Sequence, residues 1–356
     1  MNDDRATTRR RFLGTAAGAT GVALATVAWP AGQAAAAVPE TDRAPASPIG
    51  GEKRGYTAGK FAFEFGGAAA EWVHSAEGGH ATADVVTEKM GADHLSKKHL
   101  GNIKYEDLSV AVGAGMSKAF YSWIAASWQA NYQRKDGALL TADFNNNLIK
   151  KLEFFNALIT ETGMPALDGS SKDAALIDVT FTPETTRLNR KVSGPVVAAA
   201  AAKQKQWIVS NFRLTIDGLD CTRVSKIEAL VVKQKFVENP VGENRDYQKE
   251  PGALEFPNLV VTLAESSAES WYTWFEDFLV KGNNGQAQEK NGKLEYLSPN
   301  LQDVLFTVEF KHLGIFKLEP DNGAQASDNL ARLRAEMYVE QMTFAQGPVV
   351  GPNDTA

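Results

Sequence analysis

The five histidines are the residues best suited to acid–base or metal chemistry in this 356-residue sequence. His94 and His99 lie five residues apart and next to Asp93, so a metal ion could draw on two imidazoles and a carboxylate. No helical pattern places them on one face and no cysteine joins them, so the alternative is a solvated polar loop, which we prefer. We therefore assign no metal ligand and no cofactor. The other three histidines are His74, His80 and His312.

The motifs of common enzymes are missing from the sequence. It contains no G-x-S-x-G nucleophile turn, no phosphate-binding glycine loop and no H-E-x-x-H pair. Asp217 and Asp220 lack the alternating oxygen ligands of a calcium loop, and Asp143 and Glu153 are expected to be solvated carboxylates at strand ends. The single cysteine, Cys221, excludes an intrachain disulfide and is expected to be a small buried side chain. We predict no catalytic residue; a hydrolase of the cell envelope is the weakest alternative.

The composition is that of a soluble globular protein with no preference for polyanions. Apolar residues make up 44% of the chain and charged residues 22%, with a net charge of −6. Residues 1–37 hold four arginines and two aspartates, so the net charge without them is −8. No stretch beyond residue 37 is dominated by basic residues, so nucleic acid is not an expected partner.

The first 37 residues have the pattern of an export signal. Paired arginines precede Phe-Leu, an uncharged Ala/Gly-rich run follows at 14–29, and four alanines at 34–37 offer cleavage sites. This order resembles the twin-arginine type of signal. An Ala-rich amphipathic helix is the alternative, but three glycines within the run oppose it. The predicted signal residues are Arg9, Arg10, Phe12 and Leu13.

The remainder of the chain is expected to be exported and soluble. Residues 38–58 are rich in Pro, Gly, Ala and charge and are predicted to be a flexible spacer. No later apolar run reaches the roughly 18–20 residues that are needed to span a bilayer. The expected location is periplasmic, cell-surface or secreted, after export by the twin-arginine pathway.

Two segments of the chain match each other at a constant offset of 151 residues. Residues 103–110 align with 254–261, and Phe120 to Ile124 align without a gap with Trp271 to Phe275. Residues 152–154 also match 308–310 at a slightly larger offset, which implies a short insertion. Several blocks in one order and one register predict a tandem duplication. The predicted domains are module 1 (59–188) and module 2 (210–346), with a linker at 189–209 and a disordered tail at 347–356.

Each module is predicted to be a β-barrel or β-sandwich with one flanking helix. The opening strand carries alternating apolar residues, and in module 2 the Asp217-Gly218 pair predicts a hairpin turn. A strand at 230–237, a long polar loop and a further strand follow. The polar loops are expected at 88–102 and 238–253, and the strands after them at 108–112 and 259–263. The closing strands are expected at 139–144, 149–158, 176–181, 293–297, 304–311 and 334–344.

Aromatic residues recur at helical spacing after the 108–112 and 259–263 strands. Ser117 is the predicted N-cap of the first helix, and Ser266 or Ser267 that of the second. The spacing i, i+3, i+4, i+7 forms one apolar stripe. Such a stripe could be a binding face, but we favour a place in the core. The predicted helix core residues are Trp123, Ile124, Trp274 and Phe275.

The order of these elements resembles the tail tube proteins of contractile phages and the related Hcp proteins. The run F-R-L-T-I-D-G-L from Phe212 is similar to the start of the family, F-x-V-x-I-D-G-L. Lys104 to Val110, followed by Gly113, is similar to the K-Y-x-D-I-x-L-x-R-G block. Trp123-Ile124 and Trp274-Phe275 are similar to the end of the family's helix. Residues 155–157 and 163–171 resemble its later F-x-N-A and G-P-x-L-D-A-x-S motifs.

The resemblance implies a structural subunit that assembles with itself. In the family six modules close a ring, so three tandem chains would suffice, and the polar loops would reach between stacked rings. The expected partner is therefore the chain itself, possible further partner proteins being unidentified. The alternative is a secreted binding or effector-carrier protein of Hcp-like fold, either monomeric or ring-forming.

Overall fold

Antiparallel strands make up most of the computed structural model, which describes residues 59–66, 70–89, 96–196, 207–239, 247–321 and 331–347. The prediction of a mainly β fold with few helices is confirmed. The predicted signal peptide and spacer lie outside the described residues, as do positions 197–206 of the linker and 348–356 of the tail. In the described ranges no helix has the length and apolar character that are required to cross a bilayer.

Module 1 contains eleven strands and one helix among its described residues. They are β1 (Lys60–Phe65), β2 (Glu71–Val73), β3 (Ser75–Gly78), β4 (Ala81–Lys89), β5 (Ser96–Tyr105), β6 (Leu108–Val112), α1 (Lys118–Trp128), β7 (Lys135–Ala142), β8 (Leu148–Met164), β9 (Leu167–Asp168), β10 (Ile177–Thr182) and β11 (Thr185–Asn189).

Module 2 contains eight strands and a distorted helix among its described residues. Its strands are β12 (Phe212–Ile216), β13 (Val224–Ile227), β14 (Leu230–Asn239), β15 (Gln248–Glu255), β16 (Leu259–Ala264), β17 (Lys290–Leu297), β18 (Val304–Pro320) and β19 (Arg332–Gln346). Its helical elements are η1 (Glu265–Ser267), α2 (Glu269–Phe275), the π-helical turn η2 (Glu276–Val280) and η3 (Gln286–Gln288).

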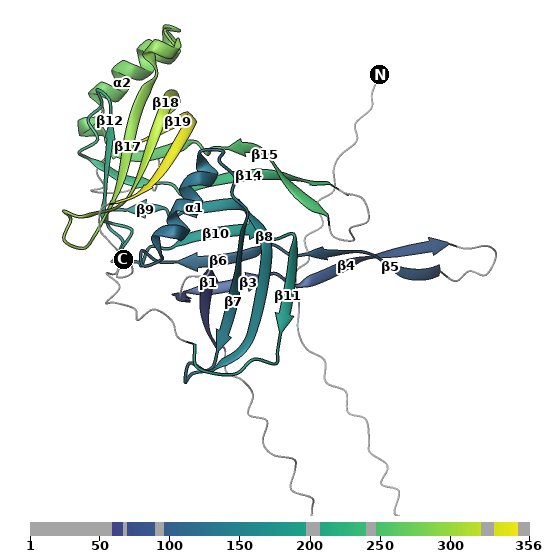
Figure 1. The fold of residues 1–356 in the computed structure, drawn as a ribbon. Coiled ribbons are helices and arrows are strands. Elements are labelled where there is room, and N and C mark those ends of the chain that lie inside the picture. Colours follow the sequence, from purple (N-terminus) through teal and green to yellow (C-terminus); the bar gives the residue numbers. More distant parts are fainter. Residues whose placement is uncertain are drawn as a thin grey trace, which may run out of the picture. The chain divides into compact units, whose positions relative to one another are not determined.

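Six successive strands follow the same order in the two main sheets. Figure 1 labels β7, β8 and β10 of the larger sheet and β17, β18 and β19 of the smaller one. The larger sheet runs β2-β1-β7-β8-β10-β6-β3, and the smaller sheet runs β12-β17-β18-β19-β16-β13-β9. The strands of the run β1-β7-β8-β10-β6-β3 therefore occupy the same successive positions as those of the run β12-β17-β18-β19-β16-β13. The larger sheet also includes β11, β14 and β15, and β4 and β5 form a separate two-stranded sheet.

The long strands β8 and β18 carry the same irregularity at matching positions. Asn156 and His312 have positive φ angles of 51° and 58°, and both strands shift register against their neighbours there. Gly137 and Gly292 stand opposite these bulges. A Cβ on Gly137 would lie 2.5 Å from Cζ of Phe154, so the site accepts no side chain. The β-bulge allows a long strand to bend sharply within its sheet.

The N-terminal cap of α1 is confirmed, whereas that of α2 is not. The hydroxyl oxygen of Ser117 accepts a hydrogen bond from the backbone N–H of Phe120 at 3.4 Å. In module 2 the turn η1 precedes the helix, and Ala268 occupies the N-cap without a side-chain bond. The prediction of a Ser266 or Ser267 cap is wrong because η1 includes both serines in its own turn.

The predicted polar loops are largely β-hairpins. β4 pairs with β5, and β14 pairs with β15. The segments 90–95 and 240–246 between these strands lie outside the described residues. The loop prediction at 88–102 fails because the β4–β5 ribbon has solvent on both faces, which removes the apolar alternation that marks a half-buried strand. The loop prediction at 238–253 fails because the end of β14 is exposed and the buried position of β15 holds a lysine, Lys249, so the segment shows no apolar alternation.

The Asp217-Gly218 signal predicts a turn correctly and a hairpin incorrectly. Gly218 has a φ of 73°, and the N–H of Leu219 bonds the carbonyl of Ile216 at 3.1 Å. The strands on either side do not pair with each other: β12 pairs with β17, and β13 pairs with β16. After this turn the chain therefore passes from β12, at one edge of the sheet, to β13 near the opposite edge.

One hydrophobic core runs through both modules. A single cluster of buried side chains includes Phe63 and Phe154 of module 1 together with Phe310 and Met337 of module 2. A smaller cluster lies on the other face of β1 and β7. The modules therefore stabilise each other by shared burial of apolar surface.

Candidate assembly interface

The most extensive contact between the modules is a continuation of the β-sheet. The end of β8, from Glu161 to Met164, pairs with the beginning of β14, from Leu230 to Lys233. The short strand β9 of module 1 also pairs with β13 of module 2. These pairings cover strand edges that a lone module would expose, and uncovered edges readily pair with another chain.

Helix α1 contacts both modules with neighbouring parts of its surface. Phe120 and Trp123 pack into module 1, where the Trp123 ring lies 5.0 Å from Phe65 and 5.6 Å from Phe181. Tyr121 packs against Phe306 on β18, with the ring centroids 5.0 Å apart. The helix thus connects the interior of its own module to the sheet of module 2.

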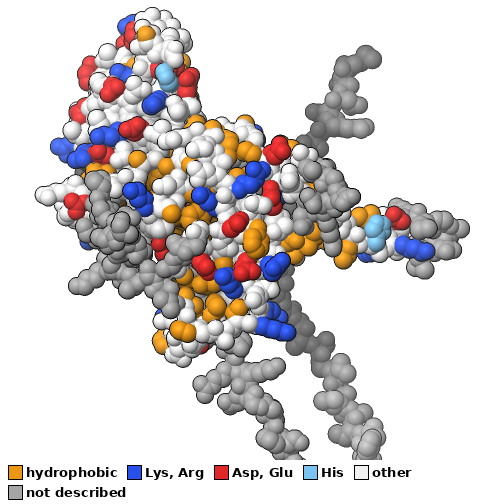
Figure 2. All heavy atoms as spheres, viewed as in Figure 1, with side chains coloured by type: hydrophobic (Ala, Val, Ile, Leu, Met, Phe, Trp, Pro, Cys, Tyr) orange, Lys and Arg blue, Asp and Glu red, His pale blue; other side chains and the backbone are white. Residues whose placement is uncertain are grey.

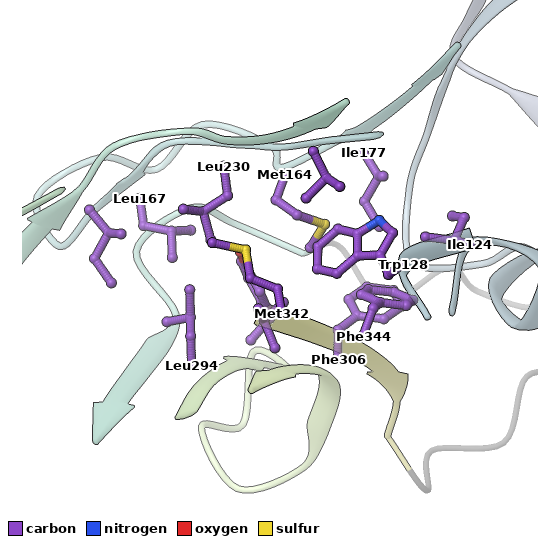
Figure 3. Close-up of a cluster of buried hydrophobic side chains, with 14 of the residues drawn as sticks. Ile124, Trp128, Met164, Leu167, Ile177, Leu230, Leu294, Phe306, Met342 and Phe344 are labelled. Atoms are coloured by element: carbon purple, nitrogen blue, oxygen red, sulfur yellow. The ribbon is translucent and has the colours of Figure 1, made fainter. Parts of the chain in front are cut away.

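The seat of α1 on module 2 is formed by β18 and β19. Trp128 lies 5.6 Å from Phe344, which also contacts Tyr121. Figure 3 shows Ile124 and Trp128 facing Phe306 and Phe344, with Met164 of β8 beside them. Burial raises the pKa of Tyr121 above its ordinary value. Its hydroxyl donates a hydrogen bond to the carbonyl of Gly113 at 2.7 Å.

A buried lysine belongs to the same contact. Lys249 on β15 is buried, its ammonium group bonds the hydroxyl of Thr182 on β10, and it lies 5.1 Å from the ring of Phe236. The backbone N–H of Lys249 donates to Glu184, and its carbonyl accepts from Arg134. Burial lowers the pKa of Lys249, against the opposing effect of nearby carboxylates. Keeping the ammonium group of Lys249 charged in this buried position therefore lowers the stability of the folded protein.

We predict that Lys249→Met stabilises the protein at pH 7. The variant keeps the length of the side chain and both backbone hydrogen bonds, and it removes a charge that burial disfavours. The melting temperature should rise by about 2 °C, as expected for roughly 1 kcal/mol in a chain of this size. Calorimetry of the chain without residues 1–37 measures the change.

The pH dependence tests the cause of this effect. With the folded pKa below the ordinary lysine value of 10.5, the unfolded chain binds more protons in the window just below 10.5, so stability rises with pH there. The advantage of Lys249→Met should shrink as the pH approaches 10.5. Lys235→Met, at an exposed position of β14, serves as the control and should change little. An advantage that does not vary with pH would contradict the charge explanation.

An exposed ion pair also joins the modules. Asp168 on β9 lies 3.1 Å from the ammonium group of Lys226 on β13. Hydrogen bonds from Ser170, with a smaller contribution from Lys226, lower the pKa of Asp168 to about 2. Because the group is largely solvated, this pair fixes the register of β9 more than it adds stability.

The residues that could perform chemistry are dispersed over the described part of the chain. His74, His80 and His99 are exposed, and His94 lies outside the described residues. Burial raises the pKa of the Cys221 thiol to about 11, which opposes formation of a reactive thiolate.

The structure does bring three possible ligands together in module 2. Atoms of Glu289, His312 and Glu340 lie within 4.8 Å of one another. Sequence reasoning missed this group because its members are far apart in the chain. Glu289 is already bonded to the imidazole of His312 and to the hydroxyl of Tyr338, at 2.8 and 2.7 Å. Burial, with this bond, raises the pKa of Tyr338 to about 12. A hydrogen-bonded network accounts for the group.

Of the four predicted helix core residues, three are buried and one is partly buried. Trp123 and Trp274 are buried, with exposed fractions of 2% and 6%, and Ile124 is fully buried. Phe275 is only partly buried and lies against the edge of the core. The predicted signal residues Arg9, Arg10, Phe12 and Leu13 lie outside the described residues. Sequence reasoning missed the contact of Tyr121 and Trp128 with module 2, although the width of the apolar stripe was a signal of a second contact.

The fold is β-rich, and strand pairing joins the edges of its two modules. Residues 57–186 match the family described as T4-like virus tail tube protein gp19. This match confirms the predicted resemblance to a tail-tube-like family for this segment. No curated protein matches the chain.

Solved structures of contractile injection systems are similar to part of the chain. The tube–sheath complex of an extracellular contractile injection system, in its extended state, is 17% identical, with a TM-score of 0.34, and covers 39% of this chain and 94% of its own. The cap that terminates the anti-feeding prophage tube is 18% identical, with a TM-score of 0.35, at 39% and 93% coverage. Hcp1 from Flavobacterium johnsoniae is 14% identical, with a TM-score of 0.24, at 38% and 98% coverage.

Proposed function

We propose that this chain is an exported structural subunit that assembles with itself into rings or a tube. The observation that carries this proposal is the contact within the chain, in which β14 extends the edge of β8 while α1 seats on β18 and β19. A contact of this type can be repeated from one chain to the next. A heterologous contact that repeats closes into a ring when its rotation permits closure.

The proposal includes a tandem duplication of one tail-tube-like module. It is supported by the common strand order of the two sheets and by the bulges at Asn156 and His312. Three chains would supply six modules in alternating order. In such a ring the hairpins β4–β5 and β14–β15 would make the contacts between stacked rings.

The proposal places the assembled protein outside the cytoplasmic membrane and gives it no catalytic role. Export is supported by the arginine pair and the uncharged run of residues 1–37. Charges of both signs alternate with apolar side chains on the face shown in Figure 2, a pattern that suits protein partners more than nucleic acid. The alternative remains a secreted binding or effector-carrier protein that uses the same fold as a monomer or ring.

The mass of the purified chain without residues 1–37 tests the proposed function. Light scattering should give a mass of about three chains at tens of micromolar, and negative-stain electron microscopy should show rings. Stacked rings would appear as tubes. A strictly monomeric mass over the whole concentration range, with no rings in the micrographs, would remove the assembly proposal and favour the monomeric binding protein.

A further inference from the structure

Helix α2 exposes the face that its counterpart α1 buries. At the offset of 151 residues, Tyr121 corresponds to Tyr272, and Trp128 corresponds to Leu279. Tyr121 and Trp128 are buried under module 2, whereas Tyr272 is 42% exposed and Leu279 is 43% exposed. The opposite sides of the two helices agree, because Trp123 and Trp274 are both buried. The difference therefore lies in the outer face alone, and the next residue along it, Val280, is 67% exposed.

The surface of module 1 that corresponds to the seat of α1 is also identifiable. In module 2 the seat consists of Phe306 on β18 and Phe344 on β19. The offset of 156 residues in this part of the chain gives Lys150 on β8 and Leu188 on β11 as their counterparts. Register supports this correspondence, since Leu188 pairs with Leu152 just as Phe344 pairs with Val308. Leu188 is 46% exposed.

The outer face of α2 and the β8–β11 surface carry charges of opposite sign. The internal contact between α1 and module 2 has no such pair of opposite charges. α1 contains no acidic residue, and the segments 304–307 and 342–346 that receive it contain no charged residue. In contrast, α2 and η2 carry Glu269, Glu276 and Asp277, and the segments 148–151 and 186–190 of module 1 carry four basic residues. Of these, Lys150 lies on the same face as Leu152 and Leu188, whereas Lys151 lies on the opposite face and pairs with Glu64. An acidic helix facing a basic strand pair favours association and suppresses incorrect pairing.

The strand edges show the same difference, because an edge that is covered in one module is uncovered at the corresponding position of the other. The edge of β8 from Glu161 to Met164 is covered by β14. Its counterpart on β18, from Lys317 to Pro320, pairs with β19 on one side and has no strand on the other side among the described residues. The counterpart of the β14 segment is 79–82, of which Gly79 is buried and precedes β4, while His80, Ala81 and Thr82 are exposed. One surface of the chain therefore carries an open edge, and another carries an exposed strand.

We propose that α2 and the free edge of β18 dock onto the β8–β11 surface and the beginning of β4 of a second copy of this chain. This inference rests on the proposed function, and it assigns the residues of the contact between chains. The outer face of α2, formed by Tyr272, Phe275, Leu279 and Val280, packs near Leu188 and Lys150 of the next copy. The contact is head-to-tail and repeats the internal junction between module 1 and module 2.

Disulfide cross-linking tests this contact. Leu279→Cys and Leu188→Cys in one chain place two thiols at the positions equivalent to Trp128 and Phe344, whose rings lie 5.6 Å apart. Mild oxidation of the assembled protein should produce dimers and trimers on a denaturing gel. The ladder should end at trimers if three chains close the ring. The chain with Cys221 alone and the pair Leu279→Cys with Leu301→Cys, in the turn before β18, should give no ladder.

A second variant avoids dependence on thiol geometry. Tyr272→Asp should reduce the mass in light scattering to that of one chain and leave the melting temperature of the monomer nearly unchanged, because the side chain is partly exposed. Leu301→Asp, at an exposed position in the turn before β18 and outside the proposed contacts, should assemble normally. Normal rings in Tyr272→Asp, without cross-linking of the Leu188/Leu279 pair, would overturn the assigned contact and leave the proposed function standing. A parent chain that never assembles would refute the proposed function itself.

Discussion

Trp123→Ala should destabilise the protein by about 5 kcal/mol, at the upper end of the range for a fully buried tryptophan. The indole fills the space between α1 and the strands β1 and β10, where it contacts Phe65 and Phe181. Its Nε1–H also donates a hydrogen bond to the carbonyl of Gln133 at 2.7 Å. The substitution removes both the packing and the bond, and it leaves the carbonyl without its donor.

Trp274→Ala should cost less, about 3 kcal/mol. Trp274 contacts Phe278, and Lys290 lies over its ring, but no hydrogen bond to its Nε1 is found among the described residues. Urea denaturation of the chain without residues 1–37 measures both values. Leu301→Ala, at an exposed position outside the proposed contacts, is the control and should cost under about 1 kcal/mol. Parent-like stability in either tryptophan variant would show that its indole is not part of the core.

Arg9→Lys combined with Arg10→Lys should retain the protein inside the cell almost completely. The twin-arginine pathway reads a pair of guanidinium groups, and lysine keeps the charge while losing the planar fork of donors. Immunoblots of cytoplasmic and exported fractions measure the distribution in a bacterium with this pathway. The pattern places Arg11 at the variable position between the pair and Phe12.

The third arginine provides the control for this experiment. Arg11→Lys changes the same functional group one position later and should leave export unchanged. Equal export of the parent, the double variant and the control would refute the twin-arginine assignment. Equal retention of both variants would show instead that the total number of guanidinium groups matters.

The alternating strands and the first helix could be predicted because their signals are local. The β1 and β12 strands carry period-2 apolar residues, and Ser117 precedes the aromatic run of α1 at capping distance. The β4 and β5 strands could not be recognised because most of their side chains are exposed on both faces. The crossing after Gly218 was missed because a turn signal specifies a local bend and not the partner of the next strand.

The contact between modules could be predicted only in part. The apolar stripe of α1 was visible in the sequence, but its division between two partners depends on where β18 and β19 lie in space. Lys249 was not recognised because its segment was predicted to be a polar loop, in which a lysine is unremarkable. Burial against Thr182 depends on a contact between residues 67 positions apart, and the position beside Phe236 depends on the pairing of β14 with β15.

The seating of α1 on β18 and β19 has a consequence for the response of the protein to dilution. Both partners of this contact belong to one polypeptide, so the contact forms at a high effective concentration whatever the concentration of chains. By mass action, a ring of three chains depends on the third power of the chain concentration, and a ring of six separate modules would depend on the sixth. Such a ring would therefore persist at dilutions that dissociate an assembly of single modules.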